Sequence, residues 1–227
     1  MPRFRIWIAA IVLASAGLAA PAVANTQMLP VEGPWAPDDY VTAIFAVQNG
    51  KITLPRRGNP KTEAFFDRLI DRGNIDQLMA GAESASRKHQ QILLILSATG
   101  EFRSRYGYAV ALGDDVQNEL VDIQIFRLAL IDRLALIDEA QACCGSAIAT
   151  TLHGTLDTLA EAHTFPSDKL IMLAQALAVS YPVIRPRLAQ LDQDALIARL
   201  EGLMAREADP GLHSALAAVL KAARHGN

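Results

Sequence analysis

The chain is poor in cysteine, in aromatic residues and in clustered positive charge. Its 227 residues include 2 cysteines and 6% aromatic residues, and 21 Lys and Arg stand against 24 Asp and Glu. Two cysteines are too few for a scaffold held by disulfides. The basic residues are interspersed with acidic ones and form no binding arm, so nucleic acid and anionic membrane surfaces are poor partners.

The sequence also lacks the common signatures of enzymes. It has no GxSxG around a serine, no glycine-rich phosphate loop, no HExxH and no CxxC. We therefore identify no catalytic residue, and we expect neither a cofactor nor a bound metal.

The first 24 residues have the three-part pattern of a secretory signal peptide. Arg3 and Arg5 precede an apolar run over residues 6–20, and small residues follow at 22–24. This run is about 15 residues long, whereas a membrane-spanning helix needs about 20. We expect cleavage between Ala24 and Asn25, export to a bacterial periplasm or to the medium, and no stable membrane anchor afterwards.

The mature chain is expected to be one helical domain of about 200 residues, long enough to bury roughly 70% of the surface of the unfolded chain. Removing Arg3 and Arg5 leaves 19 basic and 24 acidic residues, a net charge of −5. Residues 25–37 contain three prolines and are expected to form an extended lead, followed by a single domain at 38–227. Alanine and leucine, both strong helix formers, supply most of the apolar content, so we predict an all-α fold.

Capped segments with a 3.6-residue hydrophobic period indicate eight or nine helices joined by short loops. The main expected helices cover residues 38–50, 59–73, 86–98, 116–138, 146–163, 167–181, 192–207 and 210–224. The helix at 167–181 has almost no charge after Lys169 and is expected to be the most buried. No fixed-period repeat is visible. We therefore predict a globular bundle, with a degenerate stack of helical hairpins as the alternative because several helices come in adjacent pairs.

Arg127 projects toward the apolar side of the expected helix at 116–138, as Gln124 does. A charge buried there without a partner costs several kcal/mol. We expect Arg127 to pair with a carboxylate from another helix. The alternative is that Arg127 anchors a ligand between helices.

His153, Asp157 and Glu161 recur at a four-residue spacing along one polar stripe of an expected helix. Imidazole and carboxylate groups at this spacing could place two or three ligands on one metal ion. A solvated helix face gives the same spacing, with an incidental ion pair between His153 and Asp157. We interpret the stripe as a solvated face and keep metal binding as the alternative.

The two cysteines, Cys143 and Cys144, are adjacent and lie at an expected helix junction, between the acidic pair at 138–139 and Gly145. We interpret them as reduced thiols that act as small apolar side chains. The alternatives are a strained vicinal disulfide, which would imply a ligand-binding or redox role, and an intermolecular disulfide. The preceding acidic residues disfavour a thiolate, so we predict that the pair is not a catalytic dithiol, although the start of the next helix would favour a thiolate on Cys144.

Two classes of function fit these observations. The first is an exported protein without catalytic activity that binds another exported protein as an accessory factor, inhibitor or protective partner. The second is an enzyme or small-molecule binder with a site between helices, formed by Arg127 or by the Cys143–Cys144 pair. We favour the first class because the catalytic motifs are absent and the mature chain is acidic. An enclosed pocket lined by polar groups would favour the second.

Overall fold

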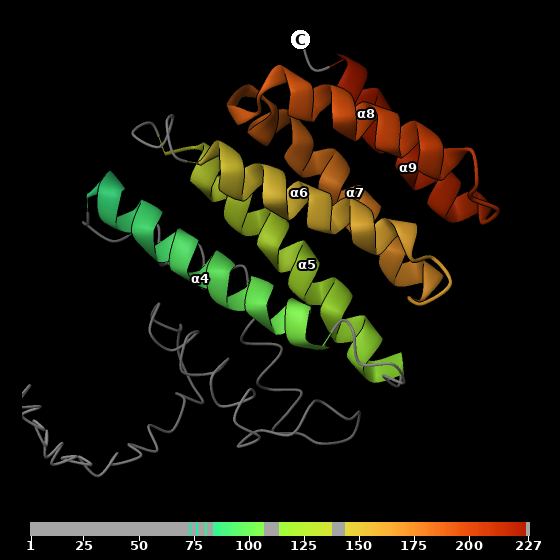
Figure 1. Cartoon of the computed structure of the whole chain (residues 1–227), viewed down its shortest axis with the longest axis horizontal. Coiled ribbons are helices and arrows are strands. Elements are labelled where there is room, and N and C mark those ends of the chain that lie inside the picture. The colour runs from blue at the N-terminus through green and yellow to red at the C-terminus, as the bar shows by residue number, and fades with distance from the viewer. Residues whose placement is uncertain are drawn as a thin grey trace, which may run out of the picture.

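The computed structural model describes residues 84–106, 114–137 and 144–225, together with residues 73, 76 and 80 (Figure 1). This part of the chain is helical and contains no strand, which confirms the all-α prediction. Its elements are α4 (Ala85–Tyr106), α5 (Asp114–Ala135), α6 (Gly145–Ala160), α7 (Ser167–Ile184), the short 3-10 helix η2 (Arg185–Arg187), α8 (Gln190–Met204) and α9 (Pro210–His225). These six α-helices do not confirm a total of eight or nine. The signal segment, the lead, the expected helix at 38–50 and most of the one at 59–73 lie outside the described residues.

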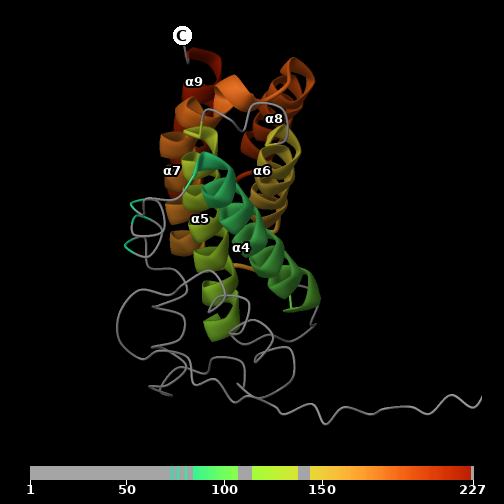
Figure 2. The ribbon, with the colours of Figure 1, turned by 90° about the vertical axis from the view of Figure 1, so that its left-hand side faces the viewer.

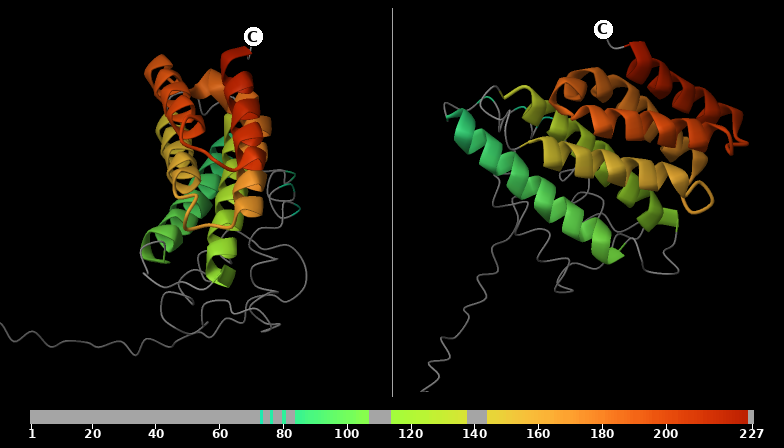
Figure 3. Two further views of the ribbon diagram at one scale, coloured as in Figure 1. Left: turned by 90° about the vertical axis from the view of Figure 1, so that its right-hand side faces the viewer. Right: turned by 45° about the horizontal axis from the view of Figure 1, so that its top comes forward.

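The described helices form three successive hairpins stacked in two layers. One layer contains α4, α6 and α8, and the other contains α5, α7 and α9 (Figures 2 and 3). Within the second layer α7 packs most extensively on α9 and α5, and α6 packs on α8 in the first. This arrangement is the stack of helical hairpins that the sequence left as the alternative.

Helices that are neighbours in one layer run in the same direction. Lys169 Nζ of α7 lies 2.7 Å from a carboxylate oxygen of Asp122 on α5, and Ser180 donates a hydrogen bond of 2.8 Å to Asp132. The contact nearer the start of α5 is made near the start of α7, and the contact nearer the end of α5 is made near the end of α7. The two helices therefore run parallel. The two polar contacts are only partly exposed and fix the register between these helices.

The core lies between the two layers, and α5 contributes more buried residues to it than α7. Its fully or almost fully buried apolar residues include Leu120, Val121, Ile123, Phe126, Leu128, Leu130, Ile131 and Leu134. The expectation that the helix at 167–181 is the most buried is therefore wrong. That helix, α7, turns one side to the core and leaves the opposite side in solvent. None of the helices in the described ranges is long and apolar enough to cross a membrane.

One helix end differs from its expected position for a physical reason. α7 continues through Pro182 to Ile184 instead of ending near Tyr181. Proline inside a helix removes one backbone hydrogen bond and strains the preceding turn. Tyr181 and Ile184 are both fully buried, and the packing of these two side chains holds the last turn of α7 in place.

Candidate functional site

Cys144 is the residue directly before the start of α6. It occupies the N-cap position, and its carbonyl oxygen accepts a hydrogen bond of 3.0 Å from the backbone N–H of Ile148. Its side chain is 1% exposed and its sulfur is a thiol. The thiol therefore lies in the core at the amino end of a helix. Cys143 lies outside the described residues.

His89, from the first third of α4, reaches the sulfur of Cys144. The Sγ atom of Cys144 and the Nε2 atom of His89 are 3.1 Å apart, within hydrogen-bonding distance for sulfur. The histidine is partly buried, whereas the cysteine is almost completely so. The structure thus brings together a nucleophilic thiol and a group that can accept its proton.

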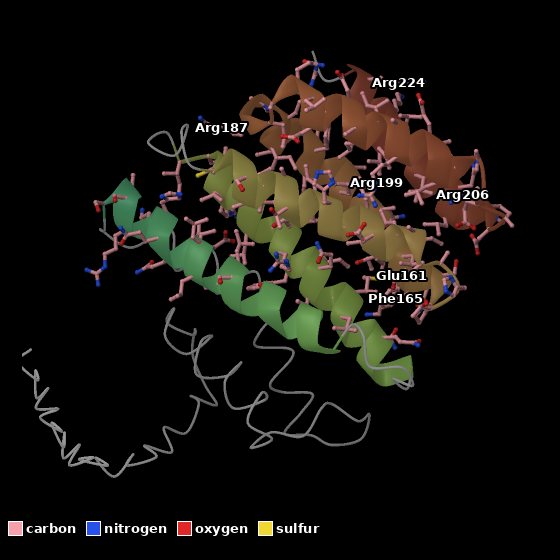
Figure 4. The ribbon with its side chains drawn as sticks, in the orientation of Figure 1. Glu161, Phe165, Arg187, Arg199, Arg206 and Arg224 are labelled. Atoms are coloured by element: carbon pink, nitrogen blue, oxygen red, sulfur yellow. The ribbon has the colours of Figure 1, made fainter. Side chains whose placement is uncertain are left out.

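Gly145 allows the start of α6 to approach the segment that follows α7. A Cβ atom at this position would lie 3.3 Å from the carbonyl oxygen of Arg187, a distance that would force one of the two to shift. Arg187 in turn donates from Nε to the carbonyl oxygen of Ala135 at 3.0 Å. Arg187 is labelled in Figure 4 at the end of the stack where α6 and α8 begin. The start of α6 therefore lies close to η2, which is in turn hydrogen-bonded to the end of α5.

Arg127 ties α5 to α4. The residue is 8% exposed, and its guanidinium donates from NH1 to the carbonyl oxygen of Leu96 and, at 2.8 Å, to the hydroxyl of Thr99. A Cβ atom at Gly100 would lie 3.0 Å from the same nitrogen, so this glycine leaves room for the guanidinium. Arg127 is therefore buried, as the sequence predicts. The pairing of Arg127 with a carboxylate from another helix stays a prediction.

Gln124 makes the corresponding connection from α5 to α6. Its side chain is fully buried, and its amide donates to the carbonyl oxygen of Thr151 at 3.1 Å and to the hydroxyl of Thr155 at 2.7 Å. The two polar residues that the sequence places on the apolar side of the helix thus bind the backbone and threonines of the helices on either side. These contacts link α5 to α4 and to α6.

The stripe of His153, Asp157 and Glu161 is divided by an arginine from α8. Arg199 donates from NH2 to Asp157 at 2.6 Å, and its NH1 lies 3.4 Å from Nδ1 of His153. Glu161 is the C-cap residue of α6 and lies beside Phe165, away from Arg199 (Figure 4). A guanidinium between the imidazole and the carboxylate repels a metal cation. Within the described ranges no group of three or more His, Cys, Asp or Glu side chains is placed to hold a metal.

A row of apolar side chains faces solvent on α7. Met172, Val179 and Val183 are 48%, 74% and 37% exposed, and Ala176 lies on the same side of the helix at partial exposure. We call these four residues the α7 face. No charged residue occurs in α7 between Lys169 and Arg185. Large apolar side chains grouped on the surface mark contact sites for other proteins more often than side chains that are exposed singly.

Comparison with protein-family models, with curated proteins and with solved structures finds no match to this chain. Its function is therefore argued from the arrangement of its own residues.

The sequence did not point to His89 or to the α7 face. His89 and Cys144 are 55 positions apart. Only the folding of the chain, which packs both α4 and α6 against α5, brings them together, and no local spacing signals it. The sequence signal of the α7 face is the absence of charged residues after Lys169. This pattern predicts a buried helix and does not by itself indicate an exposed apolar face. A stretch without charge is buried on all sides only if neighbouring helices surround it, and α7 has neighbours on three sides.

Proposed function

We propose that this protein is exported and acts by binding another exported protein through the α7 face. The full chain would contain eight or nine helices, of which the six described α-helices carry the binding surface. The observation that supports this function best is the exposed apolar row on α7. Its partner is expected to present an apolar surface without charge, because a charge buried against this face would have no partner there.

The position of α7 in the stack favours this proposal. α7 is the middle helix of its layer, between α5 and α9 (Figure 2), so among the described helices the α7 face lies at the centre of this layer. Stacks of helical hairpins present extended surfaces of this kind to protein partners. In the opposite layer, Arg199 of α8 forms an exposed ion pair with Asp157 of α6.

The contacts of the buried polar residues favour protein binding over a ligand site at Arg127. Arg127 and Gln124 use their donors on backbone oxygens and threonine hydroxyls of α4 and α6. A ligand at this position would have to replace contacts that hold the helices together. A partner that binds the outer surface of the stack does not have to break these contacts between helices.

The proposal is tested by placing a photo-crosslinking residue at Val179 in the protein expressed in its native host. A captured partner is then purified and its binding to the wild type is compared with its binding to Val179→Glu. We expect the glutamate to weaken binding at least about tenfold, because it puts a charge without a partner into an apolar contact.

Ala198→Glu is the matched control. Ala198 is exposed near the middle of α8 in the other layer, so the same charge is added to a helix surface outside the α7 face. Both substitutions are expected to change the free energy of unfolding by no more than about 0.5 kcal/mol. Equal affinity of the partner for the two variants would contradict the proposal, and so would capture of only a second copy of this chain.

A further inference from the structure

The junction at the start of α6 combines two features that favour the thiolate form of a cysteine. Cys144 is the N-cap residue of α6, and the positive end of the helix dipole lies at this position. The Nε2 atom of His89 is 3.1 Å from its sulfur. The two side chains come from different helices, so the pair is created by the fold and not by a local sequence motif. This observation is independent of the α7 face.

The distance between the two atoms fits a hydrogen bond between the thiol and the imidazole. Sulfur and nitrogen ligands around a tetrahedral zinc ion are about 3.5 Å apart, given metal–ligand bonds of about 2.3 and 2.0 Å. The observed 3.1 Å is shorter and suits a direct hydrogen bond between thiol and imidazole. The pair is therefore arranged for proton transfer from sulfur to nitrogen.

Burial of the sulfur limits the size of the molecule with which it can react. At 1% exposure the thiol cannot be reached by a protein disulfide or by a bulky electrophile. Only a molecule close to the size of water is small enough to react with a sulfur buried to this extent. Hydrogen peroxide has this size and reacts with thiolates.

We propose that Cys144 is a peroxide-reactive thiol and that His89 accepts its proton. The thiol proton moves to Nε2 of His89, and the thiolate sulfur attacks one oxygen of hydrogen peroxide. A sulfur–oxygen bond forms as the oxygen–oxygen bond breaks, and the departing hydroxide takes the proton from His89 and leaves as water. Cys144 becomes a sulfenic acid, and hydrogen peroxide is reduced to water.

The two single-cysteine variants test the proposal. Cys143→Ser retains only Cys144, and Cys144→Ser retains only Cys143. Each purified protein is treated with hydrogen peroxide, and the sulfenic acid is trapped with dimedone and quantified by intact mass. We expect Cys143→Ser to react at least about tenfold faster than Cys144→Ser, although its thiol is buried. An equal or slower reaction of Cys143→Ser would overturn the proposal, because burial would then only protect the thiol.

His89→Ala, made in the Cys143→Ser protein, tests the role of the imidazole. We expect the rate of oxidation to fall about tenfold and to be restored by free imidazole, which fits the space left by the side chain. A purely structural role of His89 would not give this rescue. An unchanged rate in a variant with wild-type circular dichroism would contradict the role of His89. If this variant does not fold, the comparison of the two single-cysteine proteins decides the reactivity of Cys144.

Discussion

Tyr181 buries a phenolic hydroxyl that makes no hydrogen bond within the described residues. Its side chain is fully buried, and its hydroxyl has no hydrogen-bond partner in the described part of the chain. Removing a buried group of this kind is neutral or favourable, because the cost of its desolvation disappears with it. We expect Tyr181→Phe to leave the free energy of unfolding unchanged or to raise it by up to about 1 kcal/mol, measured by urea denaturation.

The same substitution should change the response to alkaline pH. Burial raises the pKa of Tyr181 above the ordinary value of 10.0, and the nearby Arg185 offsets part of this effect. Because the unfolded phenol ionises first, the stability of the wild type is complete below pH 10.0 and declines as the pH rises through the higher pKa of the folded state. Tyr181→Phe lacks this decline. A parallel loss of stability in both proteins above pH 10.0 would show that the hydroxyl is not desolvated.

Arg127 offers a second test at the level of a single residue. Arg127→Met removes the donor to Leu96 and Thr99, and it would leave a paired carboxylate buried without its counter-charge. We expect the free energy of unfolding to fall by about 3 kcal/mol. Arg133→Met is the control, because Arg133 makes an exposed pair with Asp76 and should cost no more than about 1 kcal/mol. A melting temperature unchanged by Arg127→Met would rule out the carboxylate pair.

Asp209 determines where the last helix begins. Its carboxylate accepts hydrogen bonds from the hydroxyl of Ser167 at 2.7 Å and from the backbone N–H of Leu212 at 2.9 Å. The hydrogen bond from Ser167, followed by that from Leu212, lowers the pKa of Asp209 below the ordinary 3.8. The contribution to stability is therefore present above pH 3.8 and is lost as the pH falls through the lower pKa of the folded state.

We expect Asp209→Ala to lower the melting temperature at neutral pH because the cap of α9 and its link to α7 are both lost. The difference from the wild type should shrink below pH 3.8. Asp209→Asn keeps an acceptor for Leu212 and should retain most of the stability without this dependence on pH. An equal loss at neutral and at acid pH in Asp209→Ala would show that the ionised carboxylate is not the stabilising group.

Individual helices could be predicted from the sequence where local chemistry marks their ends. Asp209 and Pro210 predict the start of α9, and Ser167 with Asp168 predicts the start of α7, as observed. The end of α7 could not be predicted in this way. Pro182 indicates a break, and only the burial of Tyr181 and Ile184 against other helices shows why the helix continues.

The sequence predicts that the helices exist better than it predicts how they pack together. Adjacent pairs in the sequence suggest hairpins, but they do not show how one hairpin packs on the next. Contacts such as that of Lys169 with Asp122 join residues far apart in the chain and decide between a bundle and a stack. The pair of His89 and Cys144 follows from the same packing, so this candidate site could not be predicted before the arrangement was known.

Export is a prediction about the whole molecule. The basic, apolar and small residues at 1–24 predict that the mature protein begins at Asn25 and is recovered in the periplasm or the medium. N-terminal sequencing of protein from these fractions measures the cleavage site directly. Recovery of a product that keeps Met1 and remains in the membrane would contradict the predicted cleavage. It would also contradict the proposed binding to an exported partner.

The parallel order of helices within each layer has an electrical consequence. At one end of the stack the amino ends of α4, α6 and α8 lie on one side and the carboxyl ends of α5, α7 and α9 lie on the other (Figure 1). Each helix end carries about half an elementary charge, positive at the amino end and negative at the carboxyl end. The six dipoles therefore separate charge across the thickness of the molecule, with reversed polarity at its two ends. An anionic group is therefore favoured beside the amino ends of α4, α6 and α8, and a cationic group is favoured beside the carboxyl ends of α5, α7 and α9.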